Sequence, residues 1–342
     1  MCKVFKKVLF GFLLSALVSC SMTSQQKEKI NGVSFVSSNK KVTSKNIQPL
    51  LNIHANYAAV MPFGFIKNIN HATLGFNKDW QWFGEQTKGI QQYVKELHKH
   101  KIRVMIKPQI WVAKGEFTGT IEMTSEDDWL QFEKDYSNFI LTFARIAAQE
   151  KVAIFCIGTE LEKFVSNRPE YWKSLIAEVK LIYKGKITYA ANWDEYTKTS
   201  FWEDLDYIGI DGYFPLSKEK TPKIATLKTA WEKHKGLMKK HTDSLNKQIL
   251  FTEFGYRSID YAAAKPWEVD YTKTSVNLTA QVNTTQALFE ALWQEKWFAG
   301  GFIWKWFIDY ENVGGKNNAR FTPQNKPAEN VIKEFYKSYD VN

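Results

Sequence analysis

The sequence has few of the residues that stabilise small disulfide-bonded proteins or support thiol chemistry. Its 342 residues include three cysteines, and only Cys156 falls in the part that we expect to fold. A single thiol excludes an internal disulfide, so the stability must come from a hydrophobic core. Cys156 lies within an apolar segment, where burial would keep its thiol unreactive. We therefore interpret Cys156 as a packing residue rather than a catalytic nucleophile.

Several common catalytic and binding motifs are also missing. The six histidines form no His-x-x-x-His pair beside a carboxylate, so we expect neither a metal nor another cofactor. There is no Gly-x-Ser-x-Gly segment of the kind that carries a serine nucleophile. The formal charge of +10 is spread along the chain instead of forming a basic stripe. This distribution argues against a nucleic-acid partner.

The N-terminus has the pattern of a bacterial export signal. Lys3, Lys6 and Lys7 precede an apolar stretch over residues 8–18, which is too short to cross a hydrocarbon layer of about 30 Å. The stretch closes with Leu-Val-Ser-Cys, which resembles a lipobox ending at Cys20. A plain signal peptide with a chance cysteine is the alternative interpretation.

These features predict the domain organisation and the location of the protein. We expect a lipoprotein signal peptide over residues 1–19, a flexible tether over 20–29 from lipidated Cys20, and a catalytic domain over 30–342. The lipid would hold the protein to a bilayer of the bacterial cell envelope, at the periplasmic face or the cell surface. We expect a monomer.

From residue 30 onward, short apolar segments alternate with longer segments of helical periodicity. Ser125, three residues before Asp128, predicts a capped helix start. This alternation predicts a single-domain α/β fold, a closed (β/α)8 TIM barrel. An open doubly wound sheet is the rival, but no Gly-rich phosphate turn follows the first strand. The expected strands cover residues 30–36, 57–62, 102–108, 153–158, 187–191, 205–211, 249–252 and 301–304, and the main helices 86–100, 125–149, 169–183, 224–245, 279–295 and 328–339.

Polar and aromatic residues follow the points where the predicted strands end. In a barrel of this type, the C-terminal strand ends carry the functional residues. The sequence also contains 13 tryptophans, which could stack on sugar rings or simply fill the core. The residues at these positions are Gln109, Trp111, Glu160, Asn192, Trp193, Asp211, Tyr213, Glu253 and Trp304.

Two of these residues form a candidate catalytic pair. Glu160 follows the fourth predicted strand and Glu253 follows the seventh, so they can face each other across the mouth of the barrel. Cleavage of a glycoside needs a proton donor at the leaving oxygen and a second carboxylate at the anomeric carbon. Either glutamate alone could be an ordinary loop carboxylate. Their joint placement predicts a glycosidase site.

Five segments together resemble glycoside hydrolase family 113, whose known members are β-1,4-mannanases. The resemblance covers about residues 30–312 and is carried by Ile106-Lys107-Pro108, Ile157-Gly158-Thr159-Glu160, Ile208 to Pro215, Phe251 to Tyr256, and Gly301-Phe302-Ile303-Trp304.

This resemblance implies roles for the site residues. Glu160 would be the acid/base of a retaining mechanism and Glu253 its nucleophile. Tyr213 would donate a hydrogen bond to Glu253, and Trp304 would form the floor beside the cleaved bond. Further sugar contacts would come from Trp111, Trp193, Asn192, Asp211, Thr159 and Lys107.

Two positions depart from the pattern of related enzymes. Thr159 stands where much of the clan has an Asn that holds the sugar 2-hydroxyl, and Gln109 stands where we expect a His. The resemblance implies a hydrolase acting on β-linked oligosaccharides or polysaccharides, above all β-1,4-mannan. The departure at Thr159 leaves an alternative, a surface lipoprotein that binds glycans without cleaving them.

Overall fold

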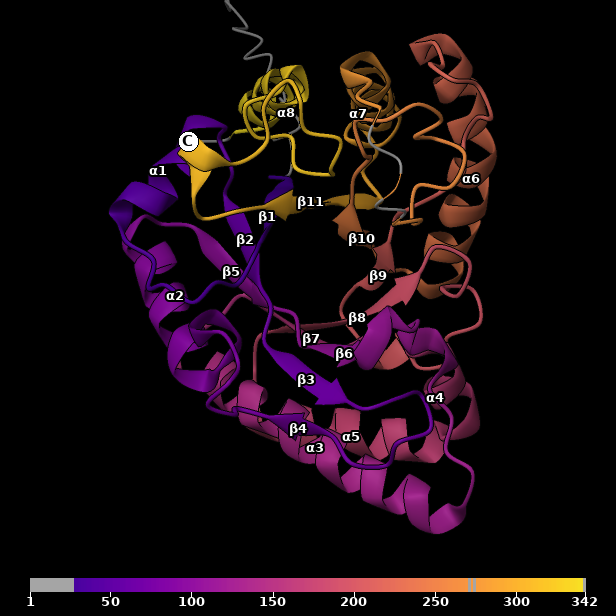
Figure 1. Ribbon diagram of the computed structural model, residues 1–342. Helices are drawn as coiled ribbons and strands as arrows, with labels where there is room; N and C mark the ends of the chain where they lie inside the picture. The colour runs from indigo at the N-terminus through magenta and orange to yellow at the C-terminus, as the bar shows by residue number, and fades with distance from the viewer. Residues whose placement is uncertain (1–27, 270–271, 273–274, 341–342) are drawn as a thin grey trace, which may run out of the picture.

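The structure is a computed structural model that describes residues 28–269, 272 and 275–340. These residues form a closed barrel of parallel strands with helices around it (Figure 1). The predicted signal peptide, Cys20 and most of the tether lie outside the described residues. No helix in the described part has the length and apolar character needed to cross a membrane.

The barrel has eight strands, and its closure confirms the predicted (β/α)8 fold. Strand β1 completes the ring by pairing in parallel with β11, where Gly32 lies opposite Phe302. The ring order is β1, β11, β10, β9, β8, β7, β5 and β2. The strands are β1 (Ile30–Phe35), β2 (Tyr57–Val60), β5 (Arg103–Ile106), β7 (Ile154–Thr159), β8 (Lys186–Asn192), β9 (Ile208–Asp211), β10 (Ile249–Phe254) and β11 (Phe298–Trp306).

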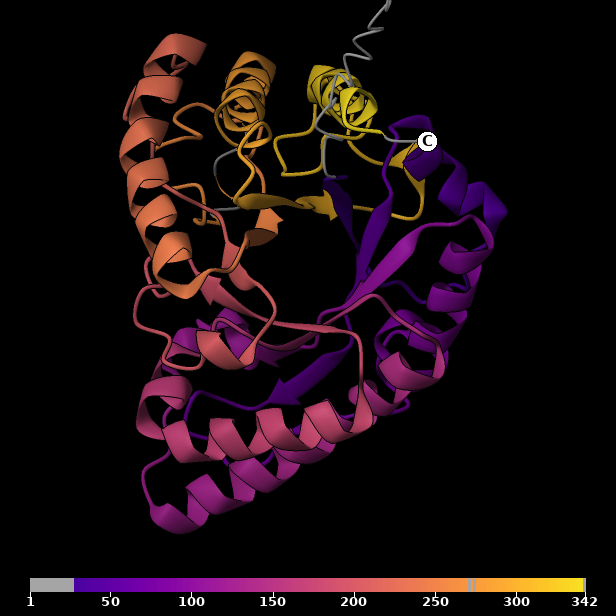
Figure 2. The ribbon, with the colours of Figure 1, turned by 180° about the vertical axis from the view of Figure 1, so that it is seen from behind.

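Helices surround the barrel in both views (Figures 1 and 2). The predicted cap is present, since Ser125 Oγ accepts the backbone N–H of Asp128 at 3.2 Å and starts α3. The connection between β8 and β9 has only a 3-10 turn, Trp202–Asp204, in place of a helix. The helices are α1 (Ser44–Asn52), α2 (Thr87–Lys99), α3 (Glu126–Gln149), α4 (Glu162–Asn167), α5 (Pro169–Ile182), α6 (Ile224–Leu245), α7 (Leu278–Leu292) and α8 (Pro327–Ser338).

The barrel interior is filled by apolar side chains. Phe302 lies across Gly32, where an added Cβ would be only 2.4 Å from its ring. Cys156 is in the same cluster, fully buried. Burial raises the pKa of its thiol to about 12, so the thiol stays protonated. Cys156 is therefore a packing residue, as the sequence indicated.

A small second sheet, which we did not predict from the sequence, extends two of the barrel segments. Its strands are β3 (Phe63–Ile66), β4 (Gly75–Phe76) and β6 (Gln109–Val112), with β3 in the middle. Strands β3 and β6 follow β2 and β5 after Pro62 and Pro108, which have no backbone N–H for a continuous ladder. The sheet packs on α3 through Phe76, whose ring centroid is 5.2 Å from that of Phe139.

A buried aromatic cluster supports the end of β7, which leads to Glu160. The Trp172 ring lies 5.6 Å from those of Tyr136 and Tyr189, and it stacks on Phe201 at 5.4 Å. Gly158 passes over this cluster, and a Cβ there would approach the Trp172 ring to 2.9 Å. The position of the strand end therefore depends on a glycine above a tryptophan.

We expect Trp172→Ala to lower the free energy of unfolding by about 3–5 kcal/mol, because it removes a fully buried aromatic ring. Leu181→Ala is the control, since this side chain lies on the same helix but is 76% exposed. Its effect should stay within about 0.5 kcal/mol. Denaturant unfolding measures both variants, and equal losses in the two would contradict the role of Trp172.

Candidate active site

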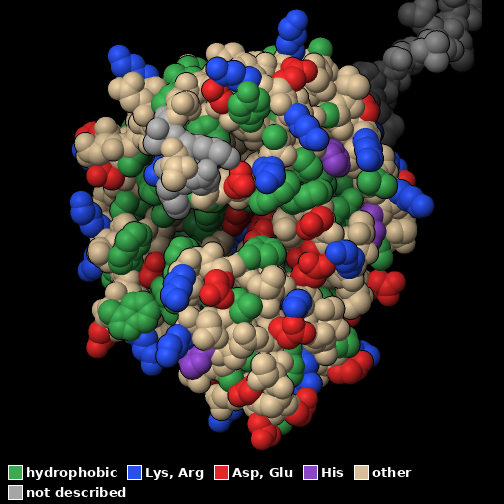
Figure 3. Space-filling model, turned by 45° about the vertical axis from the view of Figure 1, so that its right-hand side comes forward, with side chains coloured by type: hydrophobic (Ala, Val, Ile, Leu, Met, Phe, Trp, Pro, Cys, Tyr) green, Lys and Arg blue, Asp and Glu red, His purple; other side chains and the backbone are tan. Residues whose placement is uncertain are grey.

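Glu160 and Glu253 both lie at the C-terminal end of the barrel. Glu160 directly follows β7, and Glu253 is the penultimate residue of β10, a strand that is two residues longer than we predicted. The two strands are separated by β8 and β9 in the ring. A hollow opens in the surface of this molecule, with acidic and basic side chains at its bottom (Figure 3).

Three donors hold the carboxylate of Glu253. Lys107 Nζ lies 2.5 Å from Oε1 and Gln109 Nε2 donates to the same oxygen at 2.9 Å. Tyr213 Oη donates to Oε2 at 2.8 Å. Hydrogen bonds of this kind stabilise an ionised carboxylate and restrict its rotation. Three donors thus fix the orientation of the Glu253 carboxylate.

Lys107 and Asp211 form a layer beneath Glu253. The Lys107 ammonium is completely buried and lies 3.0 and 3.1 Å from the two Asp211 oxygens. Burial opposes its charge, but the two carboxylates outweigh this effect and raise the pKa of Lys107. Burial and the charge of Glu253 raise the pKa of Asp211 to about 7, although Lys107 and the Thr252 hydroxyl act in the opposite direction.

The burial of Lys107 and Asp211 does not fit the role that we expected for them. We expected Lys107 and Asp211 to contact sugar hydroxyls, but their side chains are 0% and 1% exposed. Their polar atoms bond to each other, to Glu253 and to Thr252. Both are therefore positioning residues for the carboxylate above them.

Glu160 sits in an unusual backbone conformation. Its φ of +50° is in the left-handed region, which costs a residue with a side chain about 1–3 kcal/mol. The surrounding hydrogen bonds maintain it: Glu160 N–H donates to Ala190 O at 2.8 Å, and the next amide, Leu161, donates to Tyr189 Oη at 2.7 Å. Tyr189 in turn donates to Glu195 at 2.7 Å.

The electrostatic surroundings of Glu160 favour its neutral form. Burial raises the pKa of Glu160 well above its usual value, and the charges of Asp211 and Glu253 raise it further. Lys107 opposes this effect without cancelling it. The two glutamates thus have contrasting environments: Glu160 is suited to donating a proton, whereas Glu253 is surrounded by three hydrogen-bond donors.

The aromatic residues at the mouth take different positions. Trp304 is half-buried at the end of β11, with Lys305 Nζ 5.2 Å from its ring centroid. Burial lowers the pKa of Lys305, while Glu253 opposes that shift. We did not single out Lys305 from the sequence, although a charge between two tryptophans at a strand end was a signal for it.

Trp193, a predicted sugar platform, packs against another tryptophan. Its ring stacks on Trp267 with centroids 5.2 Å apart and contacts Phe214 at 5.9 Å. Trp267, which we also did not predict for the site, belongs to the segment between β10 and α7. The face of Trp193 that meets Trp267 is therefore occupied by protein.

Asn192 and Thr159, which we expected to contact the sugar, form hydrogen bonds with the protein backbone. Asn192 Oδ1 accepts the backbone N–H of Trp193 at 2.9 Å. Thr159 Oγ1 donates to Pro108 O at 3.1 Å. The Asn192 amide nitrogen has no such bond among the described residues, so it is the part of this pair that suits a sugar hydroxyl.

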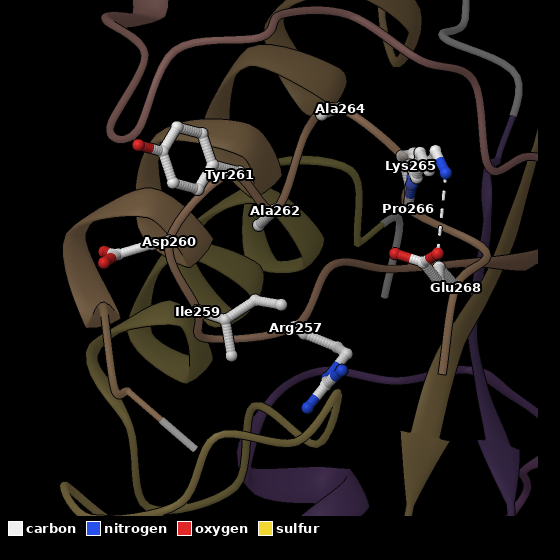
Figure 4. A pocket seen from close by; sticks show the side chains of 9 residues that line it. All are labelled: Arg257, Ile259, Asp260, Tyr261, Ala262, Ala264, Lys265, Pro266 and Glu268. Atoms are coloured by element: carbon white, nitrogen blue, oxygen red, sulfur yellow. Dashed lines mark ion pairs between the residues drawn. The ribbon is translucent and has the colours of Figure 1, made fainter. Parts of the chain in front are cut away.

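A separate cavity of about 260 Å³ lies within the segment after β10 (Figure 4). Its lining includes Arg257, Ile259 and Tyr261, and an ion pair of 3.5 Å joins Lys265 to Glu268. Neither Glu160 nor Glu253 contributes to it, so it is distinct from the catalytic centre. The described residues also contain no cluster of three or more His, Cys, Asp or Glu side chains suited to a metal ion.

Paired carboxylates of contrasting environment, at the ends of the fourth and seventh strands of a (β/α)8 barrel, are the groups that hydrolysis of a glycoside requires. The chain matches the profile of Glycoside Hydrolase Family 113 over residues 36–326 and belongs to that family. It is therefore a glycoside hydrolase. No curated protein sequence matches it.

Solved structures share the fold. A GH113 β-1,4-mannanase is 22% identical with a TM-score of 0.79, covering 91% of this chain and 99% of its own. The GH113 β-mannanase of Alicyclobacillus acidocaldarius, in complex with ManMIm, is 20% identical with the same TM-score, covering 91% and 98%. A Faecalibacterium prausnitzii β-glucuronidase is more distant, with 12% identity and a TM-score of 0.59, covering 91% of this chain and 49% of its own.

We expect Glu160→Gln to stabilise the protein at neutral and higher pH. A carboxyl group whose pKa is raised on folding makes its full contribution to the free energy of unfolding only below its unfolded pKa of about 4.5. This contribution is lost as the pH rises through the folded pKa. Glutamine does not ionise, so Tm should rise by about 2 °C near pH 8 and stay unchanged near pH 4. Glu178→Gln, at an exposed position in the middle of α5, should leave Tm unchanged. A lower Tm for Glu160→Gln at both pH values would contradict this account.

Proposed function

We propose that this protein is a retaining hydrolase of β-linked, mannose-containing chains, with β-1,4-mannan as its principal substrate. The observation that carries the mechanism is the contrast between the two glutamates. Glu253 is held by Tyr213, Gln109 and Lys107, while its surroundings keep Glu160 neutral. The choice of mannan rests on the family and on the β-mannanases that share the fold.

The reaction would proceed in two displacements. A Glu253 oxygen attacks the anomeric carbon while Glu160 gives its proton to the glycosidic oxygen, so the C–O bond breaks and a glycosyl ester forms. Glu160, now a carboxylate, then takes a proton from water, whose oxygen attacks the same carbon. The ester bond breaks, Glu253 leaves as a carboxylate, and the product keeps the β configuration.

Other residues would shape this reaction without forming bonds to carbon. Trp304 would provide the floor beneath the sugar at the cleaved bond, since its ring lies half-buried at the end of β11. Gln109 bonds the nucleophile where we expected a histidine, and its amide keeps the same hydrogen bond at every pH. We therefore assign Gln109 to the orientation of Glu253.

The position of Thr159 favours one second candidate function, glycan binding without turnover. Its hydroxyl donates to Pro108 O, so it is directed to the backbone rather than to a sugar. An enzyme that lacks a donor for the sugar 2-hydroxyl loses stabilisation of the transition state. The presence of both carboxylates makes hydrolysis the preferred function.

Hydrolysis is tested with wild type, Glu160→Ala and Glu253→Ala on mannan, glucomannan and manno-oligosaccharides, with products resolved by size. Both variants should lose at least about 10³-fold in kcat on these substrates, because each lacks one of the two reacting groups. With a dinitrophenyl β-mannoside, which needs no proton, Glu160→Ala should still release one equivalent of phenol in a burst. Glu253→Ala should release none.

The anomer formed first distinguishes the two stereochemical outcomes and is read by proton NMR. A β product supports the retaining mechanism, and an α product would contradict it. Binding of manno-oligosaccharides by wild type with no cleavage, unchanged by Glu253→Gln, would instead establish the binding protein.

We also propose that the protein is anchored to the cell envelope through lipidated Cys20. The support is the Leu-Val-Ser-Cys segment after an apolar stretch with three lysines before it. In a bacterial host supplied with labelled palmitate, wild type should carry the label and enter the detergent phase. Cys20→Ser should do neither. Unlabelled, water-soluble wild type would indicate a plain signal peptide.

A further inference from the structure

The outer face of the small β4-β3-β6 sheet carries aromatic side chains beside the catalytic centre. Side chains on its strands alternate, so Gly64, Ile66, Ile110 and Val112 are buried beneath the sheet. Phe63, Phe65 and Trp111 lie on the opposite, outer face, with Trp111 52% exposed. We call Phe63, Phe65, Trp111 and their neighbour Trp80 the aromatic platform.

The platform is continuous with the nucleophile. Gln109, which donates to Glu253, is on the same face of β6 as Trp111, two residues further along. In the parallel pairing of β3 with β6, Phe63 lies opposite Gln109 and Phe65 lies opposite Trp111. Neighbouring strands are about 4.8 Å apart, so these four side chains form one surface that starts at the catalytic carboxylate.

Trp80 extends this surface away from the catalytic centre. Its ring meets the Phe65 ring edge-to-face with centroids 4.7 Å apart, and its side chain is 65% exposed. Gly75 lies opposite Phe65 on β4 and adds no side chain to the outer face there. The platform therefore continues across the sheet from Trp111 through Phe65 to Trp80.

The turn that carries Trp80 is fixed to the sheet. Buried Gln81 donates to Phe63 O at 3.0 Å and accepts the Lys78 N–H at 2.7 Å. Gln86 donates to Gln81 O at 2.8 Å and so adds a second attachment. The turn that carries Trp80, the most exposed ring of the platform, is therefore ordered before any ligand arrives, which reduces the entropy lost on binding.

We propose that the aromatic platform binds further sugar residues of the polysaccharide whose bond is cleaved between Glu160 and Glu253. The apolar faces of pyranose rings stack on flat aromatic side chains, and the platform begins at a residue that touches the nucleophile. This proposal rests on the proposed hydrolysis of a β-linked glycan and gives the enzyme a preference for long chains.

The test compares Trp80→Ala and Trp111→Ala with wild type on soluble glucomannan and on a dinitrophenyl β-mannoside. Each variant should lose about tenfold in kcat/KM on the polymer, mainly through a higher KM. A loss of this size is what the removal of one stacked ring should cause. Trp80→Ala, at the far end of the platform, should keep wild-type kcat/KM on the short substrate, which does not reach Trp80. The conservative variants Trp80→Phe and Trp111→Phe should regain most of the polymer activity.

Trp82→Ala is the matched control. Trp82 is in the same turn as Trp80, is 49% exposed, and has no ring contact with the platform among the described residues. It should leave both substrates unaffected. Equal losses on polymer and short substrate for Trp80→Ala would show a structural role, and unchanged polymer kinetics would show that the platform does not bind the chain. Either result overturns the proposal.

Binding measured without turnover separates this proposal from the proposed function. In a Glu253→Gln background, calorimetry with glucomannan should show about tenfold weaker binding for Trp80→Ala, with mannobiose binding unchanged. This result would support the platform even if wild type cleaved no glycan. A change of oligomeric state in Trp80→Ala, seen by size-exclusion chromatography, would identify the platform as a protein interface and overturn the proposal.

Discussion

The active site depends on one buried ammonium group. Lys107, from the segment after β5, lies between Asp211 of β9 and Glu253 of β10 and joins three barrel strands at their C-terminal ends. Without it, two carboxylates would be buried together, and their repulsion would favour protonation of one of them. With it, Glu253 has a cationic partner that helps to fix its orientation. The shape of the catalytic centre follows from this neutralisation.

The same layer explains how one residue type can have two functions. Glu253 is surrounded by donors, whereas the half-buried Glu160 faces the negative charges of Asp211 and Glu253. The left-handed backbone at Glu160 turns this side chain toward the centre immediately after β7. Its conformational cost is met by a network that runs through Tyr189 to Glu195. Strain and unfavourable charge thus concentrate where proton transfer is needed.

The small sheet links the chemistry to the outer surface. Gln109 belongs to β6 and bonds Glu253, while the next residue on the same face, Trp111, is exposed. Since β3 and β6 follow two barrel strands within two residues, the barrel itself sets the position of this surface relative to Glu253. A long polysaccharide would therefore meet a preformed surface rather than a mobile loop.

Local sequence patterns were sufficient for the barrel and for the placement of Glu160 and Glu253 at the ends of its strands. Periodicity located the strands and the main helices, Ser125 marked the start of α3, and the ends of the apolar segments identified Glu160 and Glu253. These signals are local because side-chain alternation and helix capping act over a few residues. The tertiary structure alone decided that Lys107 and Asp211 lie beneath Glu253, that Gln109 bonds it, and that Trp193 packs on Trp267. Each of these contacts joins residues more than 70 positions apart, and burial, which sets their charge and their access to a ligand, exists only once the whole barrel has closed.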